Sequence, residues 1–205
     1  AASLKGQVLG AGEPVAQSTV TLWAASAAAP KQLAQARTDA NGRFSLSVPD
    51  TGSGTSLYLV AQGGQSTANK AAGNNPAIGL IAVLGSKALA MVTINEMTTI
   101  ASVWTHNQFI NGTAIQAQPL QLKIAAGNVP NFVNLATGGW GGVIQDPLNS
   151  GQTPTMGNFA TLANVLAACV ARVRPEACET VFQAAKGPSG AAPTDTLTAA
   201  QAIAR

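Results

Sequence analysis

The sequence predicts an α+β protein, in which an antiparallel β-sandwich precedes a mainly helical region. Two patterns support this fold class. In the first third of the chain apolar and polar residues alternate, which is the period of a strand with one buried face. After Thr93 apolar residues recur with the spacing of one helix face. We expect a sandwich with added strands over residues 1–92 and a helical region over residues 93–205, either separate or packed on the sandwich as one unit.

The predicted strands follow the alternation of apolar residues. Residues 19–23 and 43–48 each gather their apolar side chains on one face, and residues 57–61 are apolar on both faces, as in a central strand. Residues 39–42 (Asp-Ala-Asn-Gly) predict a tight hairpin turn, because Asn-Gly tolerates positive φ angles and Asp bonds the backbone ahead of it. Residues 63–76 are rich in Gly, Asn, Ser and Ala and predict a long loop, followed by strands at 78–84 and 88–92.

The N-terminal part resembles the carboxypeptidase-regulatory or transthyretin-like β-sandwich over about residues 3–65. The motifs are a first G-x-V strand, a Pro-containing turn, a V-x-L strand and then T-D-x-x-G-x-F. They are carried by Gly6, Val8, Pro14, Val20, Leu22, Thr38, Asp39, Gly42 and Phe44. The resemblance implies a non-enzymatic accessory module of an exported protein, with sheet edges that could pair with a neighbour.

Apolar stripes predict three helices towards the C-terminus. The first runs to Pro175, the second covers residues 178–185, and the third is capped by Thr194 and extends through Ile203. The stripe of the first helix consists of Phe159, Leu162, Ala163, Leu166, Cys169, Val170 and Val173. The stretches INEMTTIASVW, NFATLANVLAACV and APTDTLTAAQAIAR are similar to a segment of large bacterial exported proteins that sometimes carry β-propeller repeats. This similarity implies export and a scaffold role.

Charge is scarce in this chain. Only 9% of the residues are charged, and between Met97 and Ala171 the charged residues are Lys123 and Asp146. Such a surface suits a secreted protein or a subunit whose surface is occupied by neighbours. The net charge of +3 is spread thinly, which argues against a nucleic-acid partner.

No apolar run reaches the roughly 18–20 residues of a membrane span. The first residues, Ala1-Ala2-Ser3, resemble a mature N-terminus after export, and the chain stops at Arg205 in what looks like the middle of an element.

Cys169 and Cys178 are the two cysteines of the chain. In an exported protein a disulfide is the expected state of such a pair. Two thiols without a nearby histidine do not suit zinc. The sequence therefore predicts a disulfide and no metal site.

The stretch from Thr93 to His106 contains the one histidine and a row of hydroxyl residues. Thr93-x-x-Glu96 has the pattern of a helix capping box. Glu96 and His106 are ten residues apart, which is about 15 Å along a helix, so they cannot share a proton or a metal. We expect a capped helix that ends in a histidine favoured by the helix dipole, and no catalytic residue.

Other motifs resemble functional sequences but lack the partners that their chemistry needs. Asp50-Thr-Gly-Ser53 copies one loop of the aspartic proteases, but that chemistry needs two such aspartates, and Asp195-Thr196 is followed by Leu197. Asn111-Gly-Thr113 is a formal glycosylation sequon. Trp23 and Trp140 are candidate ligand-stacking residues, although a tryptophan in a glycine loop equally often fills a core. We expect no cofactor.

The sequence thus favours a non-enzymatic extracellular or cell-surface structural subunit of a filament, sheath, surface layer or matrix. Its partners would be copies of itself or neighbouring surface proteins, bound through non-ionic contacts. The alternative is a carbohydrate-binding or adhesive module that takes a polysaccharide. An enzyme ranks third. The identity of the partner and the assembly symmetry are not encoded in any motif.

Overall fold

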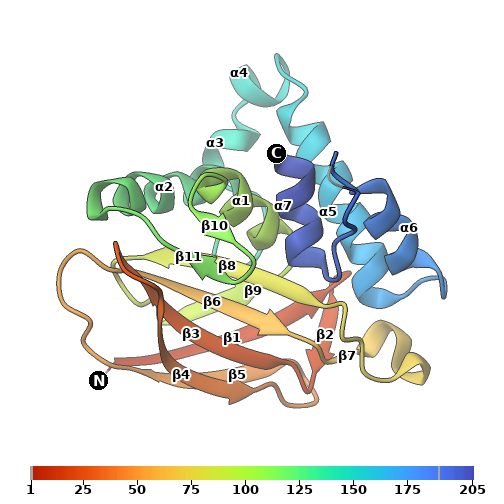
Figure 1. Cartoon of the computed structure of the whole chain (residues 1–205), viewed down its shortest axis with the longest axis horizontal. Coiled ribbons are helices and arrows are strands. Elements are labelled where there is room, and N and C mark those ends of the chain that lie inside the picture. Colours follow the sequence, from red (N-terminus) through yellow and green to blue (C-terminus); the bar gives the residue numbers. More distant parts are fainter. Residues whose placement is uncertain (1, 189) are drawn as a thin grey trace.

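The computed structural model describes residues 2–188 and 190–205 and confirms the α+β class (Figure 1). One sheet has the order β5 (Arg43–Val48), β1 (Ala2–Gly10), β2 (Glu13–Ala16) and β7 (Gln65–Ser66), and β9 (Met91–Ile94) pairs in parallel with β1. The other sheet has the order β4 (Lys31–Arg37), β3 (Thr19–Ala25), β6 (Ser56–Gln62) and β8 (Gly79–Gly85). A short hairpin joins β10 (Ile110–Asn111) to β11 (Ala114–Ile115).

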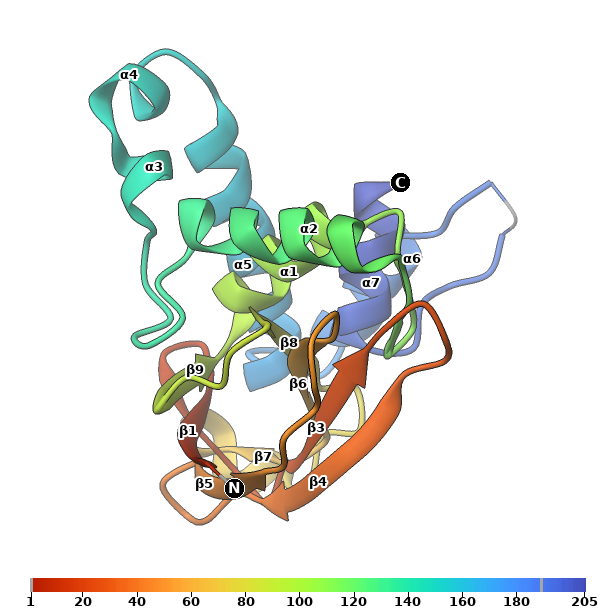
Figure 2. The ribbon, with the colours of Figure 1, turned by 90° about the vertical axis from the view of Figure 1, so that its left-hand side faces the viewer.

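The helices gather on one side of the sheets, next to β8, as Figures 1 and 2 show. They are α1 (Glu96–His106), α2 (Pro119–Phe132), α3 (Gly142–Gln145), α4 (Pro147–Ser150), α5 (Thr155–Ala171), α6 (Ala177–Ala184) and α7 (Thr196–Ala204). The 3₁₀ helix η1 (Thr67–Ala72) contacts β2 and β7 instead. α1 lies at the centre of this layer and contacts β8, α2, α5 and α7. Within the described residues no helix is both long and apolar enough to cross a membrane.

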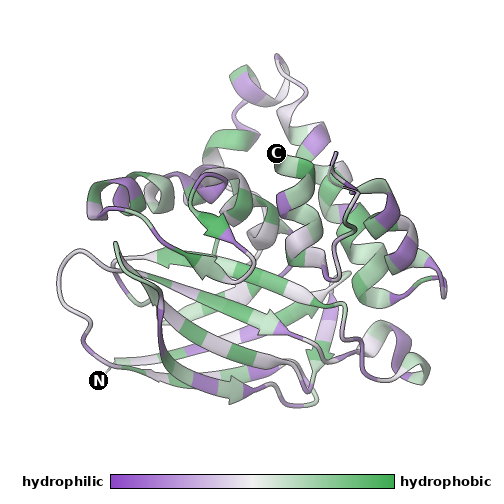
Figure 3. Ribbon diagram, viewed as in Figure 1, coloured by the Kyte–Doolittle hydropathy of each residue, from purple (hydrophilic) through white to green (hydrophobic). Residues whose placement is uncertain are grey.

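The predicted strands at 19–23, 43–48, 57–61 and 78–84 correspond to β3, β5, β6 and β8. β6 is the strand between β3 and β8 in its sheet, and its residues from Ser56 to Ala61 are all buried, as expected for a central strand. Figure 3 colours much of β6 and β8 as hydrophobic. The buried side chains of sheets and helices form one cluster that includes Leu22, Ile81 and Leu166. The core therefore runs through both halves of the chain.

Three expectations about the N-terminal half need correction. Residues 39–42 do form a turn, in which Asp39 Oδ1 accepts hydrogen bonds from the amides of Asn41 and Arg43 at 2.8 and 2.9 Å. The turn is not a hairpin turn, because β4 pairs with β3 whereas β5 pairs with β1, so the chain crosses between sheets there. The predicted loop at 63–76 contains β7 and η1, and the strand expected at 88–92 begins only at Met91.

Candidate functional site

Helix α1 begins later than predicted, and the capping box of Thr93 and Glu96 is wrong. The N-cap is Asn95, whose Oδ1 accepts from the amide of Thr98 at 2.9 Å, while Thr98 Oγ1 accepts from the amide of Asn95 at 3.0 Å. The reason is strand pairing: Thr93 and Ile94 belong to β9 and lie opposite residues of β1. Thr93 Oγ1 donates instead to Ala136 O at 2.9 Å.

The hydroxyl row of α1 covers the outer edge of β8. The amide of Ile81 donates to Thr99 Oγ1, and the amide of Val83 donates to Ser102 Oγ, each at 3.0 Å. Thr98 Oγ1 donates to Ile81 O at 2.9 Å. These three hydroxyl residues are fully buried. Because a buried amide without a partner costs about 1–3 kcal/mol, the hydroxyl row stabilises the sheet edge. Its role here is structural.

Helix α7 covers the first residue of β8 in the same way. The amide of Gly79 donates to Thr196 Oγ1 at 3.0 Å, and Thr196 Oγ1 donates to Gly79 O at 2.6 Å. The predicted cap at Thr194 is wrong, because Asp195 is the N-cap and its Oδ1 accepts from the amide of Thr198 at 2.8 Å. Asp195 therefore begins a helix.

Glu96 and His106 are both buried, at opposite ends of α1. Glu96 Oε1 accepts from the amide of Ala11 at 2.8 Å, and desolvation by burial raises the pKa of its carboxyl to about 7. His106 Nδ1 lies 3.0 Å from Ser102 O, and its Nε2 has no hydrogen-bond partner in the described part of the chain. Burial lowers the pKa of His106 to about 4, so the expected stabilisation of a charged histidine by the helix dipole is wrong. Neither residue lines the pocket or the groove described below.

The disulfide between Cys169 and Cys178 is present and joins α5 to α6. Next to it, Asn75 Nδ2 donates to Cys169 O at 2.9 Å, and Arg172 donates from its guanidinium group to Ala72 O at 2.7 Å and to Asn74 O. These bonds fix the 63–76 segment to the end of α5. Within the described residues no three His, Cys, Asp or Glu side chains form a cluster that could hold a metal ion.

The two candidate stacking tryptophans lie on different elements. Trp23, on β3, stacks on Tyr58 with ring centroids 6.4 Å apart. Trp140, just before α3, packs against Phe159 with centroids 5.5 Å apart. Both side chains are half-buried. Their role in ligand stacking stays a prediction.

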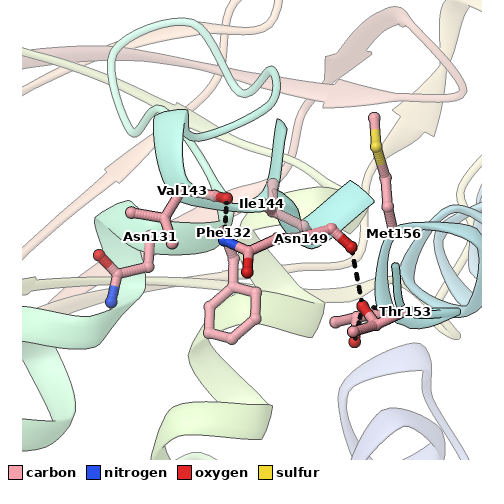
Figure 4. Close-up of a pocket in the computed structure, with 8 residues that line it drawn as sticks. Asn131, Phe132, Val143, Ile144, Asn149, Thr153 and Met156 are labelled. Carbon is pink, nitrogen blue, oxygen red and sulfur yellow. Dashed lines mark hydrogen bonds between the residues drawn. The ribbon is translucent and has the colours of Figure 1, made fainter. Parts of the chain in front are cut away.

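A projecting arm, defined here as residues 142–153 with α3 and α4, stands away from the sheets at the top of Figure 1. At its base lies a pocket of about 250 Å³ lined by Phe132, Val143, Ile144 and Met156, which we call the arm pocket (Figure 4). Its polar rim consists of Asn131, Asn149, Thr153 and Thr155. Asn149 holds the arm together, because its Nδ2 donates to Val143 O at 2.8 Å and its O accepts from Thr153 Oγ1 at 3.0 Å.

The arm exposes apolar side chains next to this pocket. Leu148 is 77% exposed and Val143 is 50% exposed. On the neighbouring α2, Leu120 and Ile124 are 66% and 58% exposed. All four lie in the part of the sequence that is almost free of charge. The arm pocket was not among the residues predicted from sequence, and the only signal for it was this scarcity of charge.

No protein-family model matches the chain. No curated protein matches its sequence significantly. Among solved structures, a 9R-lipoxygenase from Cyanothece PCC8801 has a TM-score of 0.29 to this chain and 13% sequence identity. The likeness covers 91% of this chain and 25% of the lipoxygenase, so the chain spans about a quarter of that protein. A likeness with such a TM-score supports no conclusion about fold or activity.

Proposed function

We propose that the protein is a non-enzymatic extracellular structural subunit that assembles with copies of itself through non-ionic contacts. The observation that carries this proposal is the arm, where Leu148 and Val143 are exposed beside an apolar pocket. Isolated domains normally keep interspersed charges over such surfaces for solubility. In the segment from Met97 to Ala171 only Lys123 and Asp146 are charged.

The chemistry of the arm suits a contact with a second copy. Full burial of one leucine side chain contributes about 1.5–3 kcal/mol, so several apolar residues must enter the interface together. Leu148 and Val143 offer such side chains, and the arm pocket offers an apolar surface to receive them. The Asn and Thr side chains of the rim supply neutral hydrogen bonds, which salt weakens little.

Both edges of the sheet β4-β3-β6-β8 are less suited to this contact than the sequence predicts for sheet edges. The edge of β8 is occupied by hydroxyls of α1 and α7. The edge strand β4 has a register shift in its pairing with β3 and carries Lys31 and Arg37 at its ends. Irregular pairing and edge cations are features that oppose strand-to-strand association. Self-association through the arm is therefore the contact we propose.

The disulfide and the resemblances support the proposed location outside the cell. Disulfides persist in oxidising compartments, which is compatible with a secreted or cell-surface protein. We also propose that the two larger sheets form a transthyretin-like β-sandwich. In support, Val20 and Leu22 lie in β3 and Phe44 lies in β5, and Gly42 of the intervening turn has the positive φ of 70° that the motif glycine requires.

The test compares Leu148→Asp with Val173→Asp. Val173 is 66% exposed and lies outside the arm, so it is a matched control for placing a charge on an exposed apolar position. Sedimentation velocity over rising protein concentration should show assembly of the wild type and of Val173→Asp, and monomers for Leu148→Asp. Raising the salt from about 0.1 M to about 1 M should leave the assembly intact.

Two outcomes would contradict the proposal. One is a wild-type protein that remains monomeric at every concentration. The other is an assembly that dissociates in high salt, because charge pairs would then hold it together. Electron microscopy of the assembled material would give its symmetry.

A further inference from the structure

A second hollow lies on the other side of α2, between this helix and the ends of β6 and β8. It is a groove of about 680 Å³, within the roughly 300–1,000 Å³ typical of small-molecule sites. Three segments form its wall: residues 54–56, residues 84–87 and the α2 face from Pro119 to Pro130. It shares no lining residue with the arm pocket.

The groove is aliphatic along most of its length. Leu84, Pro119, Leu120, Ala126 and Pro130 line it. Sugar-binding sites commonly offer an aromatic ring for stacking, and the residues that line this groove include none. The lining therefore suits a flexible aliphatic chain better than a saccharide.

Polar groups in the groove favour a negative charge on the ligand. Lys87 and Lys123 both line it, and both are exposed. Lys123 is also the only cation between Met97 and Ala171. Ser56 lines the groove as well: the residue is 3% exposed, and its Oγ has no hydrogen-bond partner among the residues that the structure describes. A buried hydroxyl without a partner is uncommon in folded proteins and supplies a donor to a bound ligand.

We propose that this groove binds an anionic amphiphile, whose aliphatic chain lies along α2 and whose carboxylate is held by Lys87 and Lys123. A fatty acid is the simplest ligand of this class. Chain burial supplies most of the affinity, at up to about fourfold per methylene group. The two lysines select the anionic head group, and Ser56 donates a further hydrogen bond to it.

The first experiment compares decanoate with 1-decanol by isothermal titration calorimetry. Decanoate should bind more tightly, by about twofold to fivefold for each exposed lysine. In the double variant Lys87→Gln/Lys123→Gln this preference should disappear, while decanol binds as before. Octanoate should bind more weakly than decanoate. Equal binding of acid and alcohol to the wild type would overturn the assignment of the lysines.

The second experiment blocks the groove by changing Gly127 to phenylalanine. Gly127 lines the groove, and a side chain there would meet no atom within 4 Å of its Cβ, so the backbone of α2 can stay in place. Gly157 on α5 is the matched control, since its Cβ would also meet nothing within 4 Å and it lies outside the groove. Gly127→Phe should abolish binding of both decanoate and decanol, and Gly157→Phe should bind both normally.

Three further outcomes decide the inference. Wild-type affinity in Gly127→Phe, or no binding of decanoate below its aggregation concentration, would overturn it. Amide shifts on decanoate binding should map to residues 54–56 and 84–87, and shifts confined to the arm would also overturn it. Because the groove is separate from the arm pocket, Leu148→Asp should retain decanoate binding whether or not self-association depends on Leu148.

Discussion

Replacing Glu96 with glutamine isolates the energetic cost of a buried carboxyl group. Glu96 is 5% exposed, and burial raises the pKa of its side chain from 4.5 to about 7. Its Oε1 accepts a hydrogen bond from the amide of Ala11 at 2.8 Å. In Glu96→Gln the amide oxygen accepts the same bond, so the substitution removes the titration and keeps the contact.

The direction of the effect follows from proton binding to Glu96. Between pH 4.5 and about 7 the folded protein keeps a proton on this residue that the unfolded chain releases. The free energy of unfolding therefore falls as the pH rises through this range, and the loss is complete above about pH 7. One pKa unit corresponds to about 1.4 kcal/mol, so the full loss is roughly 3 kcal/mol. Below about pH 4.5 Glu96 is protonated in both the folded and the unfolded state, so burial of this side chain no longer lowers the free energy of unfolding.

Urea unfolding of wild type and Glu96→Gln at about pH 4, 6 and 8 measures this cost. The free energy of unfolding of the variant, relative to wild type, should rise by roughly 3 kcal/mol between about pH 4 and pH 8. His106 titrates in both proteins, so its contribution cancels. Glu179→Gln, at an exposed position on α6, controls for the loss of one negative charge. A difference that stays constant with pH would refute the reasoning.

Replacing Cys169 and Cys178 together with serine should lower the free energy of unfolding by roughly 2–3 kcal/mol, measured by urea unfolding; a variant as stable as wild type would contradict this. Ser102→Ala should lower the free energy of unfolding by about 1–3 kcal/mol, because it leaves the amide of Val83 buried without an acceptor. Faster hydrogen exchange at that amide is the specific readout, and unchanged exchange would count against it. Asn75→Ala should lower the free energy of unfolding by about 1–3 kcal/mol, because Asn75 holds the 63–76 segment to α5. It should also speed proteolysis of this segment, and an unchanged rate of cleavage would contradict the prediction.

Strands were predicted well from the sequence because their signal is local. Alternation within residues 19–23 or 43–48 depends only on which side chains face the core. The partner of each strand is a property of distant residues. The turn at 39–42 illustrates this, since its internal hydrogen bonds formed as expected while its two strands joined different sheets. Likewise, nothing near Met91 indicates that β9 pairs in parallel with β1.

The start of α1 and the candidate site were less predictable for related reasons. Thr93 and Asn95 are both good N-cap residues, and the choice between them was made by the pairing of β9 with β1. The role of the hydroxyl row of α1 could not be predicted, because its partners on β8 are backbone groups, which no sequence motif reveals. Val143 and Leu148 belong to two four-residue helices, which are too short to show a helical period. The one sequence signal was the scarcity of charge between Met97 and Ala171, where Lys123 and Asp146 are the charged residues.

The cover that α1 provides for β8 has a consequence for biosynthesis. A chain grows from its N-terminus, so β8 is complete before the hydroxyl residues of α1 have been added. Until they arrive, the amides of Ile81 and Val83 are open to any extended segment, including that of another nascent chain. The hydroxyls of α1 close this edge once the helix has formed. A fragment that ends before Glu96 should consequently aggregate, even though it contains all the strands of the two larger sheets.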